Sequence, residues 1–277
     1  MRGRFQSSSR ASFGLSIALA VASSNASAFD FLTTDGTKLF RGDFDGTVSS
    51  PVTLSSGIQS LTTLGEGVSL AGASEGDIIA LGTSATAGRW KMFRLDDPNG
   101  TPTLVQIGSL NHGVGSLVFA NGKMYGVDDT LNALRVYEFN PANGNATTTF
   151  NTGIAAGGGG GLAYNPNSGL FYLTDATNNR LYSWTPGNAA TLVGPLGLGI
   201  SNNGLEFHNG RLYASVRPDS AVNTLRVGTV DINTGTFSSF ATATGVSGNG
   251  TGFVVVPEAG TVVALGLGLV WLRKRRA

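Results

Sequence analysis

The sequence predicts an all-β fold, a β-propeller of five four-stranded blades over residues 29–256. Three observations predict it. A pattern of four short strands recurs, with Gly115, Gly161 and Gly204 at its start and spacings of 46 and 43 residues, which suits propeller blades. The chain contains 41 glycines with abundant Thr, Ser and Asn, a composition that favours tight turns and short strands over helices. The four-strand pattern is incomplete at both ends of the region, and the first strand missing at the start is present at the end.

The first 28 residues have the three parts of a secretory signal peptide. A basic start, Met1–Arg10, precedes an apolar stretch at 11–22, and Ala26-Ser27-Ala28 forms a small-residue cleavage site. The apolar stretch is too short for a transmembrane helix. We expect Sec export, cleavage by signal peptidase and a mature chain that begins at Phe29.

The first and last strands of the body predict how the ring closes. Residues 29–34, 38–44 and 48–54 resemble the second, third and fourth strands of a blade that lacks its first strand. Residues 252–256 resemble an isolated first strand. Joining these segments makes one blade from both ends of the body, which closes the ring and leaves no free sheet edge.

The middle of the body supplies the other four blades. Three clear copies of the pattern lie at 116–150, 161–194 and 204–240, and Asn-Gly and Asp-Gly pairs fall between strands, where hairpin turns favour them. A weaker copy precedes them, with strands expected at 67–71, 77–82, 89–95 and 103–107. The alternative fold is a β-sandwich, which would not require a repeat near 45 residues.

The last 21 residues form a distinct tail. Val256, Pro257 and Glu258 precede an uncharged run at 261–272, and a basic end follows that consists of Arg273, Lys274, Arg275 and Arg276. A helix over that run is about 18 Å long, against about 30 Å for the hydrocarbon core of a bilayer. Basic side chains that reach the headgroups and local thinning of the bilayer would let this short C-terminal transmembrane helix span it, with the basic end in the cytoplasm.

This tail resembles the PEP-CTERM sorting signal of Gram-negative bacteria, in which Val-Pro-Glu-Pro precedes a short transmembrane helix and an Arg-rich end. Val256, Pro257 and Glu258 match, and Ala259 replaces the second proline. The resemblance implies transient anchoring in the inner membrane and recognition by an exosortase. It further implies cleavage near Pro257-Glu258, and release or attachment at the cell surface, often together with exopolysaccharide production. An uncleaved anchor is the alternative.

Charge and cysteine content exclude several classes of function for the body. The whole chain carries 18 basic and 17 acidic residues, but 7 bases and 1 acid lie in the two end segments. The body therefore has 11 basic and 16 acidic residues, a formal charge of −5, which argues against nucleic-acid binding and against docking on anionic lipid. With no cysteine, the chain has no disulfide, thiol nucleophile or Cys-ligated metal site.

Candidate ligand-binding residues gather on one predicted face, where connections from fourth to first strands and from second to third strands meet. They are His112, Asp128, Asp129, Asp175, Asn202, Asn203, Arg217 and Asp219. Asp35 occupies a position comparable to those of Asp129 and Asp175. An Asp that follows a strand often caps a turn through nearby backbone N–H groups, which is the alternative interpretation. His208, the other of the 2 histidines, is expected in an exposed turn.

Three functions remain open, and a non-enzymatic one is favoured. The first is an exported surface or matrix protein whose propeller binds exopolysaccharide or a surface protein. The second is a propeller hydrolase, lactonase or lyase that holds a metal such as Ca²⁺ through carboxylates. The third is a structural module without a ligand. No cofactor, catalytic residue or metal ligand is assigned, because a propeller fold does not specify function.

Overall fold

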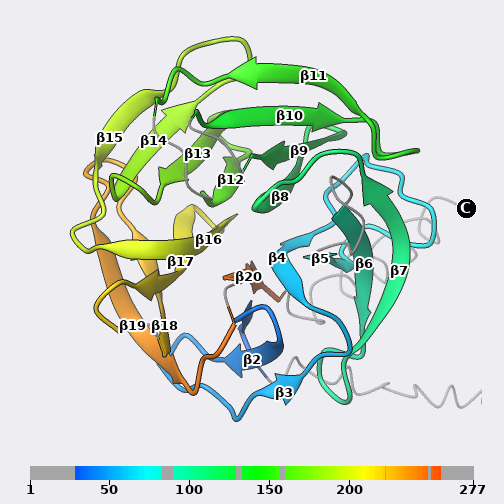
Figure 1. The fold of residues 1–277 in the computed structure, drawn as a ribbon, viewed down its shortest axis with the longest axis vertical. Coiled ribbons are helices and arrows are strands. Elements are labelled where there is room, and N and C mark those ends of the chain that lie inside the picture. Colours follow the sequence, from blue (N-terminus) through cyan, green and yellow to red (C-terminus); the bar gives the residue numbers. More distant parts are fainter. Residues whose placement is uncertain are drawn as a thin grey trace, which may run out of the picture. The chain divides into compact units, whose positions relative to one another are not determined.

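A computed structural model describes residues 29–82, 90–128, 133–155, 160–221, 223–248 and 251–256, which belong to one compact unit. Five antiparallel four-stranded sheets surround a central axis (Figure 1). The first strands of the five sheets contact one another in the cyclic order β20, β4, β8, β12 and β16. The predicted five-bladed β-propeller is therefore confirmed.

Blade 1 joins the two ends of the body, as the sequence predicts. Its strands, from first to fourth, are β20 (Phe253–Val255), β1 (Phe31–Thr34), β2 (Lys38–Gly42) and β3 (Val52–Thr53). Phe31 pairs with Val255 and Thr33 with Phe253, so the last described strand lies antiparallel to the first. The backbone N–H of Val256 donates to the carbonyl oxygen of Asp30 at 2.8 Å, which extends this pairing by one residue.

The remaining blades follow one another along the chain. Blade 2 contains β4 (Ile58–Thr63), β5 (Ile78–Gly82), β6 (Trp90–Asp96) and β7 (Thr103–Leu110). Blade 3 contains β8 (Ser116–Ala120), β9 (Lys123–Val127), β10 (Arg135–Phe139) and β11 (Ala146–Asn151). Blade 4 contains β12 (Leu162–Asn165), β13 (Leu170–Asp175), β14 (Arg180–Trp184) and β15 (Thr191–Pro195). Blade 5 contains β16 (Ile200–His208), β17 (Arg211–Pro218), β18 (Thr224–Val230) and β19 (Phe237–Thr244).

The first strand expected in blade 2 at 67–71 is wrong. The true first strand is β4, nine residues earlier, and residues 67–71 belong to the connection between β4 and β5. Gly67 and Gly72 both adopt positive φ, which a strand does not. Val68 and Leu70 are buried against Phe119 and its neighbours, so a buried loop carries the apolar residues that suggested a strand.

Five hydrophobic interfaces hold neighbouring blades together. Because side chains alternate along a strand, successive residues of each first strand pack against opposite neighbours. Leu117 of β8 belongs to the core shared with blade 2, whereas Val118 belongs to the core shared with blade 4. Leu162 and Ala163 of β12 divide in the same way between blades 3 and 5. Each blade is thus buried on both faces, and the cores form a closed series.

Glycines let the first strands approach closely where these strands begin. A Cβ added to Gly204 would lie 2.1 Å from the carbonyl oxygen of Thr251, and one added to Gly252 would lie 2.6 Å from the backbone nitrogen of Leu61. The backbone N–H groups of Leu117 and Leu162 donate to the hydroxyl oxygens of Ser60 and Ser116 in the preceding blades. The ring is therefore tight at this end, and its inner strand edges are satisfied by neighbouring blades.

The predicted end segments lie outside the described residues. These are the signal peptide at 1–28 and the tail at 257–277, including Pro257, Glu258 and the basic residues 273–276. Among the residues that the structure describes, no helix is long and apolar enough to cross a membrane.

Candidate binding site

The residues predicted for the ligand face occupy the expected end of the propeller, where first strands begin and second strands finish. They do not form one cluster there, because each described member bonds within its own blade or to an adjacent one. Asp129 lies outside the described residues, and for Asn202 the backbone alone is described, within β16. Whether this face binds a ligand stays a prediction.

The group in blade 3 contains His112, Tyr137 and Asp128. The phenol of Tyr137 donates to the Asp128 carboxylate at 3.0 Å, and the His112 ring lies 4.4 Å from the Tyr137 ring between centroids. Burial raises the pKa of Tyr137, and the hydrogen bond to Asp128 raises it further. Asp128 is buried, so it supports the blade interior rather than an open face.

In blades 4 and 5, polar groups join strand ends. The Asp175 carboxylate accepts hydrogen bonds from the backbone and the side chain of Asn178, so it caps the turn after β13. The side-chain amide oxygen of Asn203 accepts from the backbone N–H of Gly161 at 2.8 Å and from the Thr174 hydroxyl, which ties blade 5 to blade 4. Asp219 follows β17, and its backbone N–H donates to Gly199 at 3.1 Å.

Blades 5 and 1 are joined by Asp35 and Arg217. The buried Asp35 carboxylate accepts backbone N–H groups of Thr37 and Lys38 in its own turn and of Ser247 and Gly248 from the other end of the body. Burial opposes ionisation of Asp35, but hydrogen bonds from Ser247, Thr37 and Lys38 outweigh it and lower its pKa. Arg217 donates to the carbonyl oxygen of Gly248. These contacts match the turn-capping interpretation.

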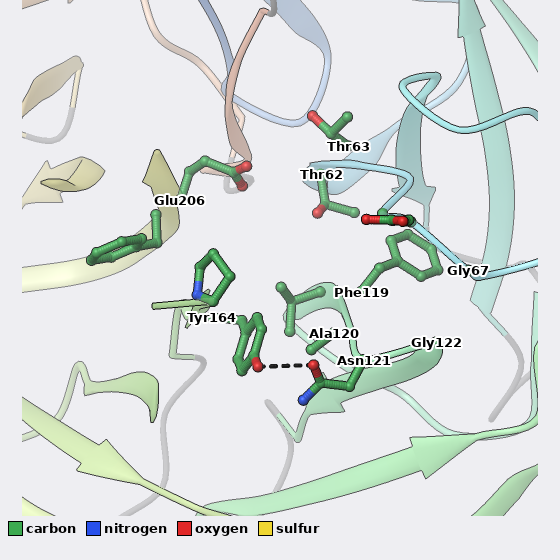
Figure 2. Close-up of a pocket in the computed structure, with 14 residues that line it drawn as sticks. Thr62, Thr63, Gly67, Phe119, Ala120, Asn121, Gly122, Tyr164 and Glu206 are labelled. Atoms are coloured by element: carbon green, nitrogen blue, oxygen red, sulfur yellow. Dashed lines mark hydrogen bonds between the residues drawn. The ribbon is translucent and has the colours of Figure 1, made fainter. Parts of the chain in front are cut away.

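A cavity of about 650 Å³ opens at the opposite end of the propeller, where the first strands finish (Figure 2). This volume lies within the range of roughly 300–1,000 Å³ typical of small-molecule sites. Four blades line this mouth cavity through the ends of their first strands, and blades 2, 3 and 4 add residues of the following turn. The lining residues are Thr62, Thr63, Gly65, Glu66, Gly67, Val118, Phe119, Ala120, Asn121, Gly122, Tyr164, Pro166, Glu206 and Phe207.

Glu206 is the unusual residue of the mouth cavity. Its side chain leaves β16 and points toward the wall formed by Thr62 and Thr63 (Figure 2). It has no hydrogen bond or ion pair with any other described residue, and its side chain is half-buried. Burial of the carboxyl raises its pKa to about 8.

The other polar groups of the mouth cavity lie on its rim. The Tyr164 phenol of blade 4 donates to the side-chain amide oxygen of Asn121 in blade 3 at 3.0 Å, so two hairpins are linked there. Tyr164 and Phe207 present half-buried rings, and Phe207 stacks on Tyr172 at 6.1 Å. Glu66 is exposed, and Lys, Arg and His are absent from the lining, so the cavity carries acidic groups only.

Sequence reasoning missed Glu206, although the repeat contained a signal. The blades align so that Glu206 occupies the position held by Thr62, Val118, Ala163 and Val254 in the other first strands. Val118, Ala163 and Val254 at that position are buried in interfaces between blades. An acid at a position that holds a small or apolar residue in the other blades indicates a functional site. His208, expected in an exposed turn, ends β16 instead, where burial lowers its pKa.

Carboxylates and imidazoles do not gather as a metal site would require. Across the described ranges, no three His, Asp or Glu side chains come close enough together to hold a metal ion.

Comparisons with known proteins identify no family for this chain. No family model matches the chain, and no curated protein matches it. Among solved structures that resemble it is a crystal structure from Bacteroides uniformis described as a candidate 6-phosphogluconolactonase. That structure has a TM-score of 0.39 and 15% sequence identity, with 78% of this chain and 68% of that chain covered. So distant a likeness says nothing about activity, which has to be argued from the site.

Proposed function

We propose that the chain is an exported cell-surface or extracellular-matrix protein whose propeller is a binding module. The mouth cavity is the observation that carries the binding role. Four blades contribute to it, it has the volume of a small-molecule site, and its half-buried Glu206 carboxyl has no partner among the described residues. Such a carboxyl is available to a ligand, which favours binding over a purely structural role.

Export and sorting rest on the two ends of the sequence. The signal peptide at 1–28 would direct the chain to Sec and signal peptidase, and the tail at 257–277 would direct it to an exosortase-type enzyme. Val256, the last described residue, donates its backbone N–H to Asp30, so the body is ordered up to the point where the tail begins.

The intact mass of the protein from its own host, measured after cell fractionation, tests the sorting part. A chain that starts at Phe29 and ends near Pro257 supports cleavage. A membrane-bound chain that keeps Arg273–Arg276 would contradict cleavage and make the tail a plain anchor.

A pull-down of isolated surface polysaccharide and surface proteins with the purified mature protein tests the binding part. Saturable binding that is lost when the mouth cavity is filled by Thr63→Trp supports it. Equal retention by the unaltered and filled proteins would contradict it, provided that circular dichroism shows the same fold for both.

An enzymatic function with carboxylate-bound Ca²⁺ remains the alternative, and it makes a different prediction. Asp35, Asp128 and Asp175, which suggested it, bond to protein groups in three separate places. A thermal shift on addition of Ca²⁺, together with turnover of a lactone or glycoside, would favour it over a binding module.

A further inference from the structure

The mouth cavity combines a carboxyl that has no partner among the described residues, a second acid and aromatic rings. This combination favours some classes of ligand over others. Glu206 and Glu66 are its titratable acids, and the lining contains no basic residue to neutralise either. The lining offers no basic residue to pair with a phosphate or carboxylate, and the exposed Glu66 would repel such a group. Anionic ligands are therefore disfavoured, and the missing partner of Glu206 is a cation or a hydrogen-bond donor.

An ammonium group satisfies Glu206 best. Opposite charges favour the ionised carboxylate, and a charge-assisted hydrogen bond is roughly twice as strong as a neutral one. Tyr164 also lines the cavity, and aromatic faces attract cations. Burial raises the pKa of Glu206, and a bound cation would lower it again.

The rest of the lining fits a sugar ring around that ammonium group. Thr62 and Thr63 supply hydroxyls opposite Glu206, and Asn121 supplies an amide whose nitrogen bonds to no other described residue. These groups come from different blades, so they surround a ligand and can bond several hydroxyls at once. Aromatic side chains at the rim suit the apolar face of a sugar.

We propose that the mouth cavity binds an amino sugar, with its ammonium group on the Glu206 carboxylate and its hydroxyls on Thr62, Thr63 and Asn121. This inference rests on the proposed binding function and names its ligand class.

Calorimetry with the purified mature protein tests the proposal with five probes: glucosamine, N-acetylglucosamine, glucose, glucose 6-phosphate and Nα-acetyl-lysine methylamide. Glucosamine should bind best. N-acetylglucosamine and glucose should bind at least about 30-fold more weakly because they lack the ammonium group, and glucose 6-phosphate should not bind measurably. Equal binding of glucosamine and N-acetylglucosamine would overturn the ligand class, and so would equal binding of Nα-acetyl-lysine methylamide.

Two variants locate the site. Glu206→Gln keeps the shape of the side chain and should weaken glucosamine binding at least about 30-fold. Glu75→Gln removes an equal charge at an exposed position outside the cavity and should leave binding unchanged. Unchanged binding by Glu206→Gln would overturn the site.

Failure of this inference is distinguishable from failure of the proposed function. If the unaltered protein retains surface material through the mouth cavity but binds none of the five probes, the amino-sugar assignment is wrong and the binding function stands. If the unaltered protein neither retains surface material nor binds any probe, the binding function and the amino-sugar assignment are both wrong.

Discussion

Thr33 and Ser215 share a 2.7 Å hydrogen bond between their hydroxyl oxygens, and both residues are completely buried between blades 1 and 5. Thr33 also donates to the carbonyl oxygen of Gly252 at 3.0 Å, so Ser215 is the donor to Thr33. One threonine thus links two neighbouring blades and the start of the closing strand.

Replacing Thr33 by Val should lower the free energy of unfolding by about 1–3 kcal/mol, because Ser215 keeps a buried hydroxyl without a partner. Urea denaturation measures this loss. The double variant Thr33→Val/Ser215→Ala should lose less than the sum of the two single variants, since it removes both partners. Additive losses would show that the two hydroxyls act independently.

Replacing Phe253 by Ala should destabilise the protein by about 3–5 kcal/mol, the usual cost for a fully buried aromatic residue. Phe253 has no exposed surface and packs on Phe31 and Tyr213, with ring centroids at 5.5 and 6.2 Å. Phe44→Ala is the matched control, because Phe44 belongs to the same aromatic group but is 37% exposed. Similar losses in the two variants, measured by denaturation, would contradict a closing role for β20.

Replacing Asp35 by Asn should cost about 1.5–3 kcal/mol at neutral pH, since the ionised carboxylate accepts several backbone N–H groups. The pKa of Asp35 is lowered in the folded protein, so its contribution is present above the ordinary value of 3.8 and is lost as pH falls through the folded value. Thermal denaturation between neutral pH and pH 2 should therefore show a smaller difference between the two proteins at the acid end. A difference that is constant with pH would contradict this.

Glu206 should make stability fall as pH rises. Its pKa is raised from 4.5 to about 8 on folding, so between these values the unfolded chain has lost a proton that the folded protein keeps. The contribution of Glu206 to the free energy of unfolding is largest below its unfolded pKa. It decreases toward the folded pKa, by at most about 1.4 kcal/mol per pH unit. Glu206→Gln should remove this slope and gain stability relative to the unaltered protein between pH 5 and 8. The difference between the two proteins isolates Glu206 from His208, which titrates in both.

The sequence was sufficient for the architecture because each blade repeats the same local chemistry. Turn glycines such as Gly122 and Gly210 adopt positive φ between first and second strands, where the Asn-Gly pairs predicted hairpins. The error at 67–71 arose because alternation alone does not separate a buried loop from a strand, and Val68 and Leu70 are buried in either case.

The site was less predictable than the fold because its residues come together only across blades. Asp128, Asp175 and Asn203 were predicted to bind a ligand because they are polar residues after or between strands. In the structure they stabilise turns and contacts between blades. Glu206 lies within a first strand between Leu205 and Phe207, where position along the chain suggests core. Its significance becomes visible when the five first strands are compared in space, since Thr62 faces it from blade 2.

The arrangement of blade 1 also determines when the protein can finish folding. Synthesis proceeds from the N-terminus, and β20 is the last strand of the propeller to be made, although it is the innermost strand of the blade that contains β1. Until Phe253–Val255 emerges, one edge of β1 is unpaired and Phe31 and Leu32 lack part of their cover. An open edge with apolar side chains invites pairing with other chains. The nascent protein therefore spends nearly its whole synthesis in an aggregation-prone form, and a stall before residue 253 would leave it there.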